Sequence, residues 1–147
     1  MHPSPNSPSD EDLESFEDLI GYRFRGRILA REALQITNAL PGEGNKSLAM
    51  FGDAVLRMIL IWQGRQQNQS ELDISDYVRR KTDWRCLSER GFASSLEKYI
   101  VTRPGQTIIA ADMAETVSAI IGAVFMDCGF GLAQCLGVMA QLGISWS

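Results

Sequence analysis

Residues 46–63 repeat apolar side chains at the three- and four-residue intervals of an α-helix, and this pattern limits the fold more than any other. The apolar positions are Leu48, Phe51, Val55, Leu56, Ile59 and Trp62. Side chains at these intervals lie on one helix face, which can pack on a core. We expect this segment to be the central core helix, capped by Asn45. Gly52 costs about 1 kcal/mol relative to alanine inside a helix, so we expect another segment to pack close to the backbone there.

Similar spacing predicts further helices, and no segment alternates apolar and polar residues as a half-buried strand does. Ser9, followed by acids, predicts a capped helix start at Asp10. Gly64, Gly91 and residues 104–106 are expected to interrupt helices. The expected helices span about residues 10–20, 27–37, 46–63, 110–127 and 132–142, with two or three pieces within 73–99. The chain is therefore predicted to be all-α, with six to eight helices.

Length and composition fit one domain with a short tail. The chain has 147 residues, of which 45% are hydrophobic and 22% are charged, as in ordinary globular domains. Residues 1–9 are rich in proline and serine and are predicted to be a flexible tail, and residues 10–147 to form the domain. No apolar run reaches the roughly 20 residues of a membrane span, and residues 2–18 lack the pattern of a signal peptide. We expect an intracellular protein, cytoplasmic or nuclear, that is neither secreted nor bound to a membrane.

Several chemistries are excluded by the residues that would carry them. The only histidine is His2, in the predicted tail, so neither a histidine-based catalytic triad nor a histidine-ligated metal is expected. Cys86, Cys128 and Cys135 form no CxxC pair and are odd in number. A disulfide framework or a structural zinc site is therefore not expected.

Charge is unevenly distributed along the chain. Six of the 18 acidic residues lie between Asp10 and Asp18, so residues 19–147 carry 12 acids against 14 Lys and Arg, a net +2 within an overall −4. This mildly basic body permits a face that contacts nucleic-acid phosphates. The candidate clusters are Arg79, Arg80, Lys81 and Arg85, and separately Arg23, Arg25, Arg27 and Arg31.

Two blocks of sequence resemble the active-site helices of the ribonuclease III family. Residues 45–56 (NKSLAMFGDAVL) resemble the family's signature, approximately NERLEFLGDAVL. Residues 115–127 (ETVSAIIGAVFMD) resemble its second active-site helix, roughly DxxEAIIGAVYLD, and residues 21–34 resemble its opening segment. The resemblance covers residues 13 to about 143 in the expected order. It implies an all-α endonuclease domain that dimerises, binds double-stranded RNA and cleaves it with Mg²⁺.

The family holds its metal ions with four carboxylates, two on each helix, and this chain departs from that pattern. Spacings of three or four residues place both acids of a pair on one helix face, and hard divalent cations prefer oxygen ligands. Asp53 is retained, and Glu115 replaces the usual Asp. Ala49 and Ser118 stand where the family has Glu, and Lys46 where the signature has an earlier acid. The resemblance therefore implies a degenerate site, with Mg²⁺ or Mn²⁺ held weakly by Asp53 and Glu115.

Three further positions carry hypotheses. Asp112 is a candidate weak metal ligand, because Asp112 and Glu115 are themselves spaced as DxxE, although that register displaces Gly122 from the family's glycine. Lys46 is a hypothetical substitute for a cation in the former metal site. Met50 and Phe51 occupy positions of interface and core apolar residues in the family, so they are the candidate dimer interface.

Together these features favour a ribonuclease III-like homodimer that has lost most or all endonuclease activity and acts in RNA binding or regulation. We expect modest, salt-dependent affinity for double-stranded RNA, with no double-stranded-RNA-binding domain after the nuclease-like domain. A heterodimer with an active ribonuclease III is a further partner prediction. Two alternatives remain: an active metal-dependent endonuclease with a reduced carboxylate set, and a structural component of an RNA–protein assembly.

Overall fold

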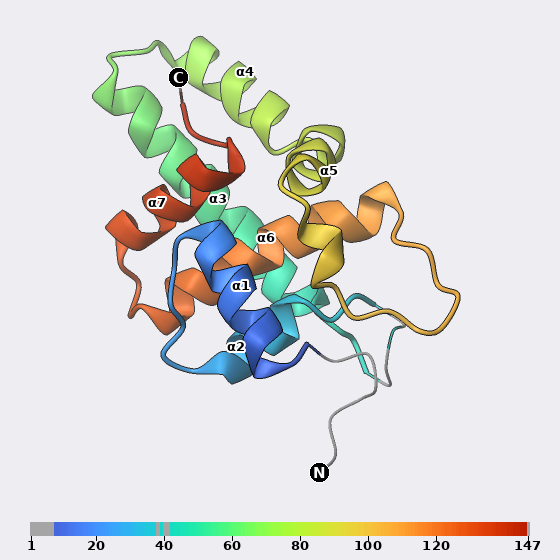
Figure 1. Ribbon diagram of the computed structural model, residues 1–147. Coiled ribbons are helices and arrows are strands. Elements are labelled where there is room, and N and C mark those ends of the chain that lie inside the picture. Colours follow the sequence, from blue (N-terminus) through green and yellow to red (C-terminus); the bar gives the residue numbers. More distant parts are fainter. Residues whose placement is uncertain (1–7, 38, 40–41, 147) are drawn as a thin grey trace.

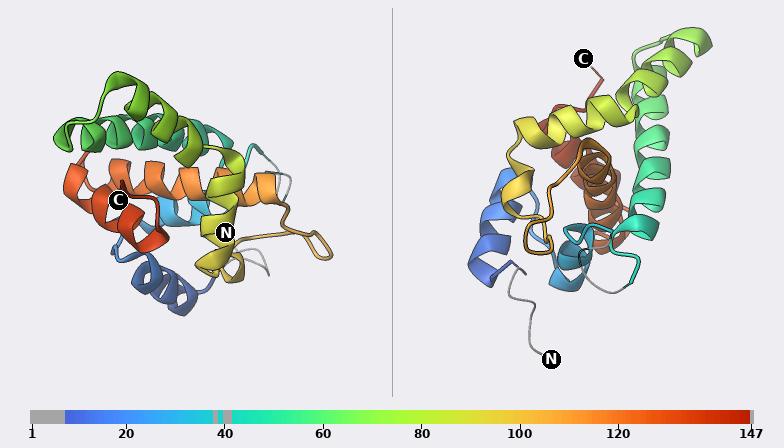
Figure 2. Two further views of the ribbon diagram at one scale, coloured as in Figure 1. Left: turned by 90° about the horizontal axis from the view of Figure 1, so that it is seen from above. Right: turned by 90° about the vertical axis from the view of Figure 1, so that its right-hand side faces the viewer.

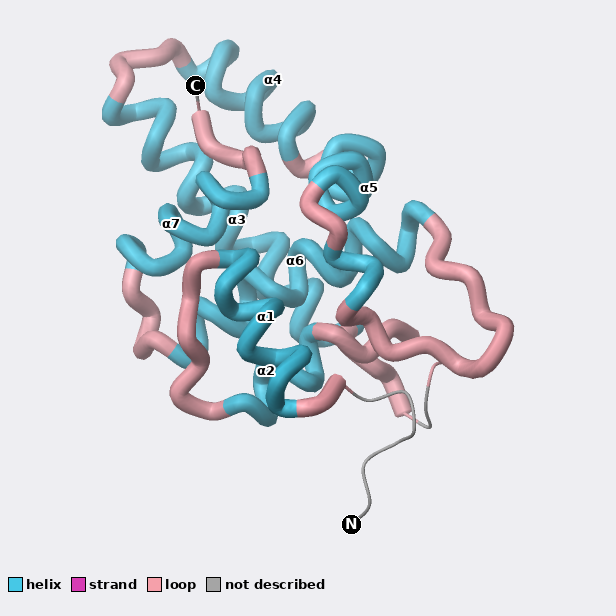
Figure 3. Tube along the Cα trace, viewed as in Figure 1, coloured by secondary structure: helices cyan, strands magenta, loops and turns pink. Residues whose placement is uncertain are grey.

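The computed structural model describes residues 8–37, 39 and 42–146, and its regular structure is helical. The helices are α1 (Asp10–Ile20), α2 (Arg27–Ala33), α3 (Lys46–Gln66), α4 (Glu71–Lys81), α5 (Trp84–Ala93), the 3-10 turn η1 (Leu96–Lys98), α6 (Ala110–Asp127) and α7 (Leu132–Leu142). Figure 3 shows loops joining them and no strand in this part of the chain, which confirms the all-α prediction. Most of the predicted tail, residues 1–7, lies outside the described residues. None of the described helices is long and apolar enough to cross a membrane.

Helix α6 forms the centre of the molecule. Every residue from Thr116 to Val124 is buried. This part of α6 is largely apolar all round, and other helices cover each of its sides. Figures 1 and 2 show α3 on one side of α6 and α1 on the opposite side. The prediction that residues 46–63 form the central helix is therefore wrong, since α3 keeps an outward face on which Met50 and Met58 are exposed.

Helices α3 and α6 cross with their backbones in contact at two glycines. A Cβ built on Gly52 would lie 1.6 Å from the carbonyl oxygen of Ser118. A Cβ built on Gly122 would lie 2.7 Å from the carbonyl oxygen of Leu48. The predicted close approach at Gly52 is thus confirmed. The crossing fixes which faces of α3 and α6 meet.

Two glycines expected to interrupt helices lie inside them instead. Gly64 is within α3, where an added Cβ would meet Ile74 at 2.7 Å and Trp146 at 3.2 Å. Gly91 is within α5, where a Cβ would meet the sulfur of Met113 at 2.4 Å. Both positions need glycine because a neighbouring side chain packs on the helix backbone. Tertiary packing therefore outweighs the helix-breaking tendency of glycine here.

The start of α3 also differs from its prediction. Asn45 precedes the helix, but its side chain makes no capping hydrogen bond. Its amide nitrogen donates instead to the carbonyl oxygen of Ala33 at 2.8 Å and to the hydroxyl of Thr116 at 3.0 Å. The buried asparagine thus joins the end of α2, the start of α3 and α6. Helix α2 ends at Ala33, earlier than predicted.

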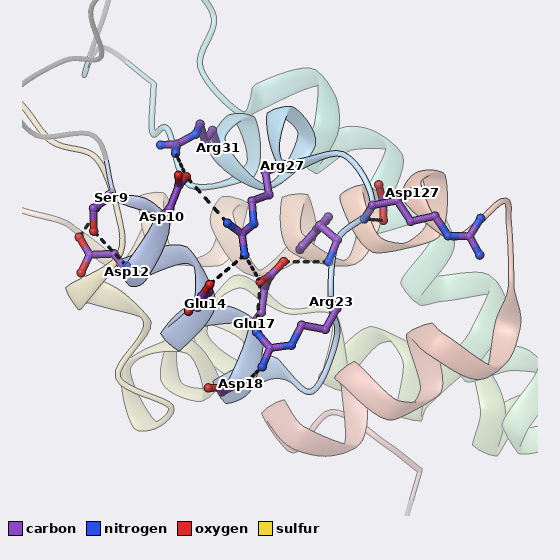
Figure 4. A network of polar contacts seen from close by, with 12 residues as sticks. Ser9, Asp10, Asp12, Glu14, Glu17, Asp18, Arg23, Arg27, Arg31 and Asp127 are labelled. Atoms are coloured by element: carbon purple, nitrogen blue, oxygen red, sulfur yellow. Dashed lines mark hydrogen bonds and ion pairs between the residues drawn. The ribbon is translucent and has the colours of Figure 1, made fainter.

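The acids of α1 pair with the arginines that follow it (Figure 4). The ion pairs join Arg27 to Glu17 at 3.0 Å, Arg31 to Asp10 at 3.0 Å and Arg23 to Asp18 at 2.5 Å. Glu17 is only 2% exposed and also accepts a hydrogen bond from the backbone N–H of Phe24. Three of the four arginines in this predicted phosphate-binding cluster therefore have their charge balanced within the fold.

A second carboxylate, Asp127 at the end of α6, holds the loop between α1 and α2. It accepts hydrogen bonds from the hydroxyl of Tyr22 at 2.6 Å and from the backbone N–H groups of Arg25 and Gly26 at 2.7 and 2.8 Å. Burial raises the pKa of Asp127, but these hydrogen bonds lower it by more, so that the pKa lies below its ordinary value. The charged form of Asp127 therefore stabilises the folded state.

Replacing Asp127 with asparagine is expected to give a pH-dependent loss of stability. A carboxylate with a lowered pKa contributes stability that is present above its unfolded pKa of about 3.9 and is lost as the pH falls through the folded value. The wild type should therefore exceed Asp127→Asn in free energy of unfolding at neutral pH, and the difference should shrink below about pH 4. Urea unfolding of both proteins across this range measures it. A difference that does not change with pH would contradict the assignment.

Candidate functional site

A pocket of about 340 Å³ lies where α3, α6 and the α4–α5 junction meet. Its lining includes Lys46, Ala49 and Asp53 of α3 and Glu115 and Ser118 of α6. Residues 46, 49 and 53 share one face of α3 through their three- and four-residue spacing, and residues 115 and 118 share one face of α6. The pocket therefore brings together residues from both sequence blocks, 45–56 and 115–127.

The glycine crossing explains how these two faces meet. Gly52 precedes Asp53 directly, and Gly122 lies one helical turn after Ser118. With the two backbones in contact at the glycines, the adjoining residues of both helices face each other across the pocket. Thr82 and Trp84, at the junction of α4 and α5, complete the wall.

The two carboxylates of the pocket already have hydrogen-bond partners within the chain. Oδ2 of Asp53 accepts a hydrogen bond from Nε of Arg57 at 3.0 Å, with both side chains about half exposed. Glu115 accepts a weak hydrogen bond from the hydroxyl of Thr37 at 3.5 Å. Ser118 is 5% exposed, so its neutral hydroxyl adds little charge or access. An exposed pair such as Asp53–Arg57 contributes less than about 1 kcal/mol to stability, and its main effect is on local charge.

Asp112 lies at the start of α6 and has a different role. Its carboxylate accepts a hydrogen bond from the backbone N–H of Ile109 at 3.1 Å, and it is not part of the pocket lining. Glu115 therefore faces Asp53 across the pocket, and Asp112 closes the first turn of α6. This is the arrangement that follows from the register anchored on Gly122.

The donor set of the pocket does not fit a tightly held divalent cation. Within the described part of the chain, no three His, Cys, Asp or Glu side chains gather closely enough to hold a metal ion. Asp53 and Glu115 supply carboxylate oxygens, whereas Ala49 supplies no ligand atom. Mg²⁺ and Mn²⁺ depend on several oxygen ligands and on carboxylate charge, so two carboxylates form a weak site.

The basic cluster at the end of α4 lies beside this pocket. Arg79 and Arg80 both bond to Asp76, at 2.6 and 3.0 Å, and these hydrogen bonds lower the pKa of Asp76. Lys81 lies over the ring of Tyr77. Arg85 stacks on Trp84, 4.9 Å from the centre of its ring. Because Trp84 lines the pocket, Arg85 continues its wall outward.

A second, larger groove lies between α3 and α4 and was not predicted from the sequence. It has a volume of about 930 Å³, and its lining includes Arg57, Arg65 and Arg79 as well as the apolar side chains of Ile61 and Val78. A signal for part of it exists in the sequence, because Arg57 follows Asp53 by four residues and is therefore its neighbour on the helix. Arginines thus extend from the pocket along the outer face of α3.

The two predicted interface residues differ in environment. Met50 is 74% exposed at the rim of the pocket. Phe51 is half-buried, with its ring centre 6.0 Å from that of Phe125 and 6.3 Å from that of Phe130. Ile61 continues the exposed apolar face of α3 beyond Met50. Met50 is therefore available to a partner, whereas Phe51 packs against the rings of Phe125 and Phe130.

Comparison with known proteins identifies relatives of one kind. Residues of this chain align with ribonuclease 3 of Shewanella sediminis at 30% identity over 124 residues, covering 80% of this chain and 55% of the relative. Ribonuclease 3 of Carboxydothermus hydrogenoformans matches at 28% identity over 137 residues, covering 84% and 58%. The chain thus spans somewhat more than half the length of these relatives. No family model matches the chain.

The fold agrees with solved nuclease domains. The nuclease domain of ribonuclease III from Campylobacter jejuni, in a structure that describes flexibility in a region involved in dimer formation, superimposes with a TM-score of 0.79 at 19% identity. The match covers 91% of this chain and 98% of that domain. A second structure of this domain gives a TM-score of 0.77 at 20% identity, covering 88% and 92%.

Proposed function

We propose that this chain, a ribonuclease III-like domain by its sequence similarity and its fold, binds double-stranded RNA as a homodimer and has lost most or all endonuclease activity. The composition of the pocket carries the proposal. Two carboxylates, Asp53 and Glu115, face each other where a ribonuclease III site uses four, and Ala49 and Ser118 take the other two places. Metal ions activate the attacking water and neutralise charge on the phosphate, so a site that holds them weakly is expected to cleave slowly or not at all.

The arginines beside the pocket support binding to the RNA backbone. Arg79, Arg80, Lys81 and Arg85 lie on α4 and α5, and Arg57 and Arg65 line the neighbouring groove. Duplex RNA is recognised mainly by its shape and through its phosphates and sugars. Such contacts are sequence-independent and weaken steeply with salt. Affinity is therefore expected to be modest, with a strong salt dependence.

The outward face of α3 supports the homodimer. Met50, Met58 and Ile61 are exposed there, with exposures of 74, 49 and 44%. Apolar side chains that gather on one face in this way are typical of an interaction surface, whereas single exposed apolar residues elsewhere, such as Ile28, are ordinary. A two-fold dimer would use this same face of both copies. A heterodimer with an active ribonuclease III would use the same face.

Replacing Met50 with aspartate is expected to weaken dimerisation at least about 30-fold, because loss of a central anchor side chain costs about 2 kcal/mol or more. The folded monomer should remain intact, since Met50 is exposed. Sedimentation velocity over a concentration series measures the change. Ile28→Asp is the matched control, because Ile28 is 82% exposed on α2. A wild type that remains monomeric at high concentration, or equal dissociation of both variants, would contradict the interface.

The proposal is tested by measuring binding and cleavage in the same sample. A labelled RNA duplex is incubated with the purified protein in Mg²⁺, one portion is run on a native gel, and another is run on a denaturing gel. We expect a shifted complex that contains full-length strands. A shift with shortened strands would instead favour the active endonuclease, an alternative supported by the shared pocket of Asp53 and Glu115.

The absence of a shift at any salt concentration would favour the third alternative, a structural component of an RNA–protein assembly that binds a protein partner tightly and free duplex weakly. Under the main proposal the protein acts inside the cell, in the cytoplasm or nucleus, where it shields RNA or regulates an active relative through mixed dimers.

A further inference from the structure

The pocket between α3 and α6 is electrically balanced by side chains of this chain. Asp53 and Glu115 supply two negative charges, and Lys46 on the same lining supplies a positive one. Arg57 supplies the second positive charge, since its Nε donates to Oδ2 of Asp53 at 3.0 Å. The intervening positions, 49 and 118, are uncharged. These four charged groups sum to zero without any bound ion.

A divalent cation would meet two obstacles in this arrangement. An oxygen of Asp53 already accepts a hydrogen bond from Arg57, and the cation would have to displace the guanidinium to use it. Lys46 lies seven residues before Asp53, two turns away on the same helix face, and its ammonium repels a second cation in the pocket. In the residues that the structure describes, no third acidic, histidine or cysteine side chain joins the two carboxylates.

We propose that Lys46 and Arg57 replace the divalent cation in this pocket, so that it presents a metal-free, charge-neutral surface to its ligand. Arg57 acts through Asp53 and is a positioning residue. Lys46 is exposed, so its ammonium is free to approach a phosphate oxygen at the pocket mouth. The consequence, which rests on the proposed function, is that duplex RNA binds equally well with and without Mg²⁺.

Binding of Mn²⁺ in the absence of RNA tests the replacement directly. Lys46→Glu removes a positive charge from the pocket and adds a third carboxylate, and we expect it to bind Mn²⁺ at least about tenfold more tightly than the wild type. Loss of the EPR signal of free Mn²⁺ measures binding. Lys98→Glu is the matched control, because Lys98 is an exposed lysine of η1 outside the pocket lining. Circular dichroism verifies that both variants fold.

Two Mn²⁺ results would overturn the proposal: a wild type that binds Mn²⁺ as tightly as Lys46→Glu, or equal gains in Lys46→Glu and Lys98→Glu. The first would mean that the pocket holds a metal despite Lys46. The second would mean that net charge, not the pocket, attracts the ion. Either conclusion is independent of RNA.

RNA affinity is the second readout and separates this proposal from the proposed function. Fluorescence anisotropy with a labelled duplex is expected to give the same affinity for the wild type in EDTA and in Mg²⁺, and a lower affinity for Lys46→Glu than for Lys98→Glu in EDTA. A wild-type affinity that rises severalfold with Mg²⁺ would overturn metal independence. A wild type that binds no duplex would contradict the proposed function, whereas the Mn²⁺ titration would still decide the role of Lys46.

Discussion

Replacing Gly52 with alanine is expected to lower the free energy of unfolding by more than about 3 kcal/mol, the upper end of ordinary overpacking costs. The added Cβ would lie 1.6 Å from the carbonyl oxygen of Ser118 and 2.6 Å from its carbonyl carbon. Both obstacles are backbone atoms of α6, so no side-chain rotation relieves the clash. The two helices must separate, which opens the core around α6. Urea or thermal unfolding measures the loss.

Gly137 provides the matched control for this substitution. It lies in α7, and a Cβ built there meets no other atom within 4 Å. Gly137→Ala is therefore expected to leave stability unchanged or to raise it by up to about 1 kcal/mol, the helix-propensity difference between the two residues. Equal stability of Gly52→Ala and Gly137→Ala would show that the backbones of α3 and α6 are not in close contact at Gly52.

Restoring the two missing carboxylates is expected to create metal-dependent cleavage. The double variant Ala49→Glu with Ser118→Glu adds two acids to the pocket that Asp53 and Glu115 line. We expect cleavage of duplex RNA in Mn²⁺ at least about 100-fold above that of the wild type, since even changes around a metal's ligands alter affinity or activity about 10–100-fold. Initial rates on a labelled duplex measure the gain.

Stability provides a second signature of this double variant. Ala49 and Ser118 are 7% and 5% exposed, so two new carboxylates there are poorly solvated and should destabilise the fold until a metal neutralises them. Mn²⁺ should then raise the melting temperature of the variant by mass action. The double variant Ala49→Gln with Ser118→Gln matches the size change without the charge. If the Glu and Gln pairs both folded and both failed to cleave the duplex, the missing carboxylates would not explain the proposed lack of activity.

The helical fold was predictable from apolar periodicity, and the bounds of three of the described helices were predicted as well. Ser9 and the acids after it cap α1, whose bounds match the prediction, and the expected bounds of α6 and α7 also match. The predictions of helix ends and caps failed where a residue contacts a segment far away in the sequence. Gly64 leaves room for Trp146, which lies near the C-terminus. Asn45 hydrogen-bonds to α6 instead of capping α3. Local propensity contains no information about such partners.

The residues that line the candidate site were largely predictable from the sequence, whereas the ion pair of Asp53 was not predicted. The resemblance named Asp53, Glu115 and the positions around them, and the glycine register placed Glu115 rather than Asp112 opposite Asp53. The pairing of Asp53 with Arg57 was missed, although a spacing of four residues on a helix points to it. The wall formed by Trp84 was not predictable from spacing, because it depends on how the α4–α5 junction packs against α3 and α6.

The most direct test of the central claim is the cleavage of labelled double-stranded RNA by the purified wild-type protein, in Mg²⁺ and separately in Mn²⁺. A parallel preparation of Asp53→Ala removes one of the two pocket carboxylates and controls for contaminating nuclease. We predict no cleavage by the wild type beyond the level of Asp53→Ala in either metal. Cleavage by the wild type that disappears in Asp53→Ala would contradict this prediction and would establish an endonuclease that works with a reduced carboxylate set.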